Sequence, residues 1–193
     1  MKVLVLGAFQ SGEWLTACLN KVSNMRKYLK ALSLVFVLVL VSSPIYARQK
    51  TTVTRIIDGD VIQIIYGGVE KRVRLIGIDA PESRIDRNAL KEANMSEDDI
   101  EAIVEMGAKA KAYVNGLIKR GNFITIEFDV KEMDRYGRLL CYVYLSNGKM
   151  LNEEIVRAGY ANVKSIPPNV KYKDRFLNAF KYAKKTERGL WEE

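Results

Sequence analysis

The chain has 193 residues, with 31 Lys and Arg against 23 Asp and Glu, and a formal net charge of +8. This length allows one domain with a substantial core and a short leader. The sequence contains no histidine, which excludes Ser-His-Asp and Cys-His triads, histidine-ligated zinc and histidine acid–base catalysis. Any chemistry must therefore use carboxylates, Lys, Arg, Tyr or a bound cation.

The beginning of the chain has the layout of a secretory signal peptide. Basic residues follow Met25, residues 31–41 form an apolar run, and the small residue Ala47 precedes Arg48. The run is shorter than the ~20 apolar residues of a comfortable membrane span. We therefore expect residues 25–47 to be a signal peptide cleaved near Ala47, which would make the protein secreted or periplasmic. The alternative is an uncleaved N-terminal membrane anchor.

Two further expectations follow from this leader. Because Met25 starts a complete signal peptide, residues 1–24 are expected to be an over-extended gene start. Cleavage would remove Cys18 and leave Cys141 as the only cysteine, so no intramolecular disulfide could form. Cys141 lies among apolar residues, which indicates a buried structural thiol. Residues 48–193 keep a mild basic excess that is compatible with a polyanionic partner but does not require one.

The remaining chain, residues 48–193, is predicted to fold as a small β-barrel with helices. Val, Ile and Thr dominate the strand-like segments, and Gly67-Gly68 marks a hairpin turn between two of them. Ser96 and the acidic residues after it are typical of a helix start, and Gly107 is expected to break or kink that helix. The segment 53–66 is expected to form two strands, or one bent strand with a tight turn, and further strands are expected at 70–78, 122–130 and 138–145. The expected helices are 96–119, 152–158 and 171–187. Five strands with about three packed helices suit the five-stranded OB-fold barrel class, an α+β arrangement.

Acidic and basic residues gather at three places in this pattern. Asp58-Gly59-Asp60 forms the first turn, Asp79-Ala80-Pro81-Glu82 ends the third expected strand, and Asp134-Arg-Tyr-Gly-Arg138 enters the last. Taken one at a time, Asp58 and Asp60 could be turn formers. A folded hairpin would nevertheless bring several carboxylates together with Arg74. Carboxylates can bind a hard cation, and an arginine beside them can bind a phosphate.

These three segments, in this order, are similar to the signature motifs of the staphylococcal nuclease (thermonuclease) family. The resemblance covers about residues 51–193 and implies an OB-fold nuclease that hydrolyses DNA and RNA with Ca²⁺. It implies that Asp60, Asp79 and the backbone carbonyl of Ala80 bind the calcium ion, and that Arg74 and Arg138 grip the phosphate. It places Glu82 near the metal as a general base or a water-positioning group, and it places Arg135 and Tyr136 in the nucleotide pocket.

These residue types suit that chemistry. Calcium binds hard oxygen ligands in a flexible geometry, and arginine offers a permanent planar charge that can hold a phosphate through two hydrogen bonds. The chain departs from the family's type member in two places. The segment between Ser83 and Ser96 is longer, and residues 164–168 offer no tyrosine where the type member stacks tyrosines on the base.

The sequence therefore predicts a secreted, calcium-dependent, sugar-nonspecific endonuclease acting on DNA and RNA. The resemblance further implies products with 3′-phosphate ends. We expect a monomer with no obligate protein partner. The alternative is a non-catalytic OB-fold module that binds nucleic acid, because the same fold is reused for binding; an uncleaved leader would tether it to a membrane.

Overall fold

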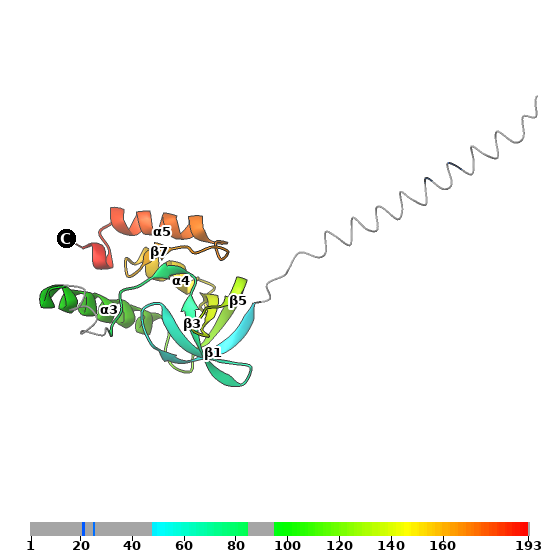
Figure 1. Ribbon diagram of the computed structural model, residues 1–193, viewed down its shortest axis with the longest axis horizontal. Coiled ribbons are helices and arrows are strands. Elements are labelled where there is room, and N and C mark those ends of the chain that lie inside the picture. The colour runs from blue at the N-terminus through cyan, green and yellow to red at the C-terminus, as the bar shows by residue number, and fades with distance from the viewer. Residues whose placement is uncertain (1–20, 22–24, 26–47, 85–94, 193) are drawn as a thin grey trace, which may run out of the picture. The chain divides into compact units, whose positions relative to one another are not determined.

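The computed structural model of the chain describes residues 21, 25, 48–84 and 95–192 (Figure 1). Apart from residues 21 and 25, the predicted gene-start extension and the signal peptide lie outside these residues, as does most of the loop after Ser83. The domain described below is the unit Tyr46–Glu193. Among the described residues, no helix combines the length and apolar character that crossing a membrane requires.

A closed five-stranded barrel forms the centre of the described domain, as predicted. Its strands are β1 (Gln49–Ile56), β2 (Val61–Tyr66), β3 (Val69–Leu75), β5 (Phe123–Met133) and β6 (Leu139–Tyr144). They follow one another around the barrel in the order β1-β2-β3-β6-β5, and β3 and β6 form the parallel pair. Alternate residues face the interior, for example Ile62 and Ile64 on β2, which are fully buried.

The prediction of one continuous strand over residues 70–78 was wrong, because the chain leaves the barrel after Leu75. Gly77 adopts a φ of +81°, which favours glycine, and a Cβ there would overlap the Phe176 ring. The next three residues form a separate strand, β4 (Gly77–Asp79), which pairs with β7 (Asn162–Lys164) in a small second sheet. β7 was not predicted. Asp79 therefore stands on this second sheet and not on the barrel.

Three α-helices accompany the barrel in the described residues: α3 (Glu97–Leu117), α4 (Leu151–Arg157) and α5 (Lys173–Lys185). Figure 1 shows the helices gathered to one side of the strands, with α4 beside α5. Ser96 caps α3 as predicted, since its side chain accepts a hydrogen bond from the Asp99 N–H. Gly107 does not break α3, which continues through it as one helix.

One buried polar side chain fixes the point where the chain leaves the barrel. Asn152 on α4 is fully buried, and its Oδ1 accepts a 2.9 Å hydrogen bond from the Val143 N–H. Its Nδ2 donates to the carbonyl of Ile76 at 2.9 Å. α4 therefore holds the segment that leads into β4. Cys141 on β6 is fully buried as predicted, and burial raises the pKa of its thiol, which keeps it protonated.

Candidate active site

The structure brings the predicted acidic and basic residues to one hollow at the turn between β1 and β2. This hollow, here called the carboxylate pocket, has a volume of about 340 Å³. Of the predicted site residues, Asp60, Arg74, Asp79, Glu82 and Arg138 line it. Its other lining residues are Ile57, Asp58, Val61, Arg72 and Lys164.

Asp60 and Asp79 converge on the same guanidinium. Arg74 forms ion pairs with Asp60 through Nη1 and with Asp79 through Nη2, the latter at 2.5 Å. Asp60 is buried, and its Oδ2 also accepts a 2.8 Å hydrogen bond from the N–H of Ala80. The Ala80 peptide therefore adjoins the Asp60 carboxylate. Two acids that stand nineteen residues apart in sequence thus lie within reach of one cation.

Asp58 has a structural role at this site. Its two carboxylate oxygens accept hydrogen bonds from the Ser83 N–H at 3.1 and 3.2 Å, and its Oδ1 also accepts from the Gly59 N–H. This carboxylate therefore fastens the segment after Pro81 to the first turn. Gly59 allows the close approach, because a Cβ there would lie 2.8 Å from the Cβ of Ala80.

Glu82 is exposed at the rim of the carboxylate pocket, and α3 sets its position. A Cβ on Gly107 would overlap the carbonyl group of Glu82 and lie 2.5 Å from the N–H nitrogen of Ser83. The helix therefore packs directly against the backbone that carries Glu82. The glycine expected to disturb the helix instead allows this contact.

Arg138 is held by an acid that the sequence analysis did not assign to the site. Its Nε donates to Asp134 Oδ2 at 2.7 Å, and its N–H donates to Asp134 Oδ1 at 3.0 Å. Partial burial alone would raise the pKa of Asp134, but these hydrogen bonds and one from the Tyr136 N–H lower it. The spacing of four residues between Asp134 and Arg138 is the sequence signal that could have identified the pair.

Arg135 and Tyr136 lie beside this pair, toward solvent. The Arg135 Nη2 donates to the Tyr136 hydroxyl at 2.6 Å, and both side chains are exposed. The Tyr136 ring also lies near two cations, with the Arg135 and Arg138 guanidinium carbons 4.8 and 5.3 Å from its centre. Neither residue lines the carboxylate pocket. Both line a neighbouring one.

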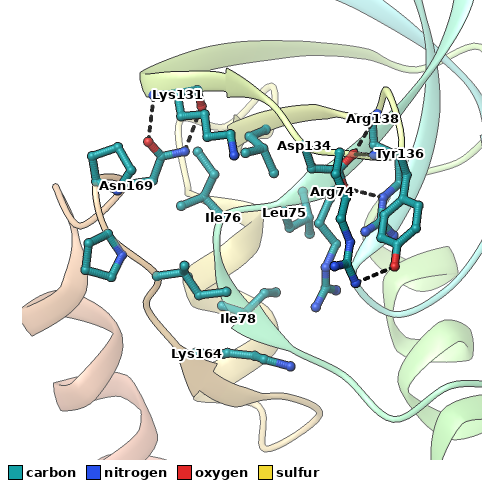
Figure 2. A pocket seen from close by; sticks show the side chains of 16 residues that line it. Arg74, Leu75, Ile76, Ile78, Lys131, Asp134, Tyr136, Arg138, Lys164 and Asn169 are labelled. Carbon is teal, nitrogen blue, oxygen red and sulfur yellow. Dashed lines mark hydrogen bonds and ion pairs between the residues drawn. The ribbon is translucent and has the colours of Figure 1, made fainter.

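This neighbouring hollow, here called the apolar pocket, has a volume of about 440 Å³ (Figure 2). Its floor includes Leu75, Ile76 and Ile78, and Ile166, Pro167 and Pro168 form part of its wall. Asn169 closes one end by a 2.8 Å and a 2.7 Å hydrogen bond with the backbone of Lys131. Arg74, Arg138 and Lys164 line both pockets, so three cations stand at the boundary between them.

The charges at this boundary affect one another. Burial lowers the pKa of Arg74, and the nearby Arg138 lowers it further, while Asp79 and Glu82 act in the opposite direction. Arg74 stays charged, because guanidinium groups do not lose their proton in proteins. Lys164 adds a charge that sequence reasoning missed, with its Nζ 2.9 Å from Asp79 Oδ2. It reaches the site only because β7 pairs with β4, and no sequence signal indicated that pairing.

The described residues contain no group of three or more His, Cys, Asp or Glu side chains placed to hold a metal. The donor set at Asp60 and Asp79 nevertheless suits a hard cation. Two carboxylates converge beside the Ala80 peptide, and the cationic side chains of Arg74 and Lys164 currently balance their charge. Calcium accepts carboxylate and carbonyl oxygens and completes its shell with water, so these residues fit that ion.

The structure is thus an OB-type five-stranded barrel that carries a site of clustered acids and arginines. Residues 72–193 match the family described as staphylococcal nuclease homologue. The chain is 32% identical to the thermonuclease of Staphylococcus hyicus over 75% of its own length and 76% of that protein. It is 34% identical to the thermonuclease of Staphylococcus intermedius, with 72% and 74% covered. It is also 32% identical to endonuclease YncB of Bacillus subtilis (strain 168), with 72% and 60% covered.

The chain belongs to the staphylococcal nuclease family. It is therefore a nuclease, a hydrolase of phosphodiester bonds, and the predicted resemblance is confirmed.

Proposed function

We propose that the protein is a calcium-dependent, sugar-nonspecific endonuclease that cleaves both DNA and RNA and leaves 3′-phosphate ends. The observation that carries this proposal is the carboxylate pocket. Asp60, Asp79 and Glu82 line it together with Arg74 and Arg138. The relatives named thermonuclease and endonuclease support the same reaction.

In this proposal Asp60, Asp79 and the carbonyl of Ala80 hold the calcium ion. When bound, the ion supplies positive charge that offsets negative charge on the phosphate and favours ionisation of a water molecule. Asp60 is well suited as a ligand because the Ala80 N–H and the burial of its side chain fix its orientation. Asp79 is more exposed and adapts more easily to an incoming ion.

Arg74 and Arg138 bind the scissile phosphate. Each can donate two parallel hydrogen bonds, and these strengthen as charge grows on the phosphate oxygens in the transition state. Arg74 is already half-buried and fixed between two carboxylates, while Asp134 fixes the Nε of Arg138. Both guanidinium groups are therefore oriented before the substrate arrives, which lowers the cost of binding the transition state.

Glu82 accepts or orients the proton of the attacking water. It is exposed at the rim of the carboxylate pocket, so water reaches it directly. The chain has no histidine, so a carboxylate is the kind of side chain in this pocket that can accept or orient the proton of the water. Gly107 holds the Glu82 backbone against α3 and thereby sets the distance of its carboxylate from the phosphate.

The test is digestion of single-stranded DNA and of RNA by the purified full chain, with calcium and with chelator. We expect cleavage of both substrates only with calcium. Glu82→Gln and Arg138→Ala should each lower the rate by about 10²–10³-fold. Lys181→Ala, on the exposed face of α5, serves as a matched surface control and should cleave normally. Tight binding without cleavage under any divalent ion would instead identify a binding module.

We also propose that the nuclease is exported, on the strength of the signal-peptide layout of residues 25–47. The measurement is the mass and N-terminal sequence of the protein recovered outside the cytoplasm. A species that begins at Arg48 is the expected result. A species that retains the apolar run, found in the membrane fraction, would point to the anchor instead.

A further inference from the structure

Lys164 occupies a position between the two pockets that the proposed chemistry leaves unused. It is the last residue of β7, and its partner in the register with β4 is Gly77. From there its side chain extends to the Asp79 carboxylate, where Nζ lies 2.9 Å from Oδ2. Figure 2 shows it beneath Ile78, on the side of the apolar pocket where Arg74 lies.

The pairing of Lys164 with Asp79 is easy to exchange. The side chains of the two residues are 54% and 39% exposed, and an ion pair in such surroundings contributes only ~0–1 kcal/mol. An ammonium group also carries three donors, so one carboxylate oxygen does not saturate it. Lys164 can therefore bind a second anion with little loss elsewhere in the structure.

The surroundings of Lys164 indicate which anion this is. Arg74 and Arg138, which line the same two pockets, are the cations assigned to the scissile phosphate. A strand held there has further phosphates on either side, and Lys164 is the remaining cation that lines both pockets. The residues that follow it, 165–168, are Ser, Ile, Pro and Pro, which provide no aromatic ring for stacking on a base. Residues 165–168 therefore offer no stacking partner, and the charge that this segment offers to the strand is that of Lys164.

We propose that Lys164 binds a backbone phosphate next to the scissile one and thereby positions the strand across the boundary of the two pockets. The inference rests on the proposed function, because it requires a polynucleotide in the carboxylate pocket. Phosphate contacts carry no information about base sequence. Lys164 therefore strengthens binding equally for strands of different sequence, and this contribution weakens as salt concentration rises.

The test measures equilibrium binding of the full chain to two short single-stranded DNAs, one all-thymidine and one all-adenosine. It is run in chelator, so that no strand is cut, at salt concentrations between about 50 mM and 200 mM. Lys164→Ala should weaken binding of both strands about threefold to tenfold at the low-salt end. It should also reduce the slope of log affinity against log salt by about 0.7, the value for one lost contact to a single strand. Lys164→Arg should restore both quantities, and Lys181→Ala should change neither.

Three results would overturn the inference. One is an unchanged salt slope in Lys164→Ala, and another is a loss of affinity confined to one of the two sequences. The third is a changed calcium affinity, measured by calorimetry with calcium alone, in a variant whose DNA binding is normal; this would restrict Lys164 to holding Asp79. Failure of the proposed function is recognised separately, as absence of cleavage by the unaltered chain with calcium. Binding in chelator does not depend on cleavage.

Discussion

At the scale of single residues, Asp134 is a side chain that has no assigned catalytic role but fixes the position of Arg138. It contacts neither the carboxylate pocket nor the expected metal ligands, yet it holds both the backbone and the guanidinium of Arg138. A guanidinium fixed at Nε keeps its two terminal nitrogens free and aimed in one direction. A phosphate can then bind without first ordering that side chain, which is the benefit of preorganisation.

We therefore expect Asp134→Ala to lower kcat/KM by about tenfold, less than the ~10²–10³-fold loss expected for Arg138→Ala. The two changes should not be additive, because Asp134 acts through Arg138. Steady-state kinetics of both single variants and the double variant check this. If the double variant loses the product of the two single effects, Asp134 acts independently of Arg138 and the interpretation is wrong.

The residues of the carboxylate pocket could be predicted because short motifs carry them. Asp60, Arg74, Asp79, Glu82 and Arg138 stand at turns and strand ends whose order along the chain is fixed, and the structure places all five in one pocket. Their roles stay predictions. Lys164 could not be found in this way. Its contact with Asp79 spans 85 residues and depends on the pairing of two three-residue strands, which are too short to show an alternating pattern.

At the scale of secondary-structure elements, α3 acts as a support for Glu82. Two glycines in this helix allow a matched comparison. Gly107 packs on the Glu82 backbone, where a Cβ would overlap the carbonyl group, whereas a Cβ on Gly116 would have no heavy atom within 4 Å. Both are helical positions, so alanine gains similar helix propensity at each, about 0.5–1 kcal/mol.

Gly116→Ala should therefore raise the free energy of unfolding by up to about 1 kcal/mol and leave the cleavage rate unchanged. Gly107→Ala should lower the rate by about tenfold or more, because small displacements of a catalytic group are costly. Chemical denaturation and cleavage kinetics of the two variants provide the measurement. Equal cleavage rates for both would show that α3 does not position Glu82.

Helices and strands with a long sequence pattern were predicted. The boundary between β3 and β4 was missed, because a single residue decides where β3 ends. The alternation of buried residues on β2 and the cap at Ser96 identify their elements directly. The end of β3 depends instead on Gly77, whose positive φ and contact with Phe176 turn the chain out of the barrel. A lone glycine inside an apolar run does not reveal this, because Phe176 is a distant residue.

At the scale of the whole domain, one buried acid joins the beginning of the domain to segments near its C-terminal end. Glu127 on β5 is 2% exposed, and its carboxylate accepts from Arg48 at 2.9 Å and from Lys171 at 2.7 Å. The hydroxyls of Tyr144 and Tyr172 donate to it as well, at 2.9 and 2.8 Å. No sequence pattern indicates this cluster, because Glu127 lies within a largely apolar strand and its four partners come from three separate segments.

This cluster makes the stability of the domain depend on pH in the acid range. Burial alone would raise the pKa of Glu127, but the hydrogen bonds from Lys171, Arg48 and the two tyrosines lower it from 4.5 to about 2. A lowered folded-state pKa means that the ionised carboxylate stabilises the fold. This contribution is fully present above about pH 4.5 and is lost as the pH falls toward 2. It amounts to about 3 kcal/mol.

We expect the free energy of unfolding, measured by urea denaturation at several pH values, to fall steeply between about pH 4.5 and 2. Glu127→Gln removes the ionised carboxylate, so the free energy of unfolding of this variant should be lower at neutral pH. Because glutamine does not titrate, that free energy should also decline less across this pH range. Arg48 and Lys171 are half-exposed, so in the variant their charged groups can turn to solvent. We therefore expect the variant to fold, which allows the comparison. Parallel declines in the two proteins would contradict the prediction and assign the acid sensitivity to other carboxylates.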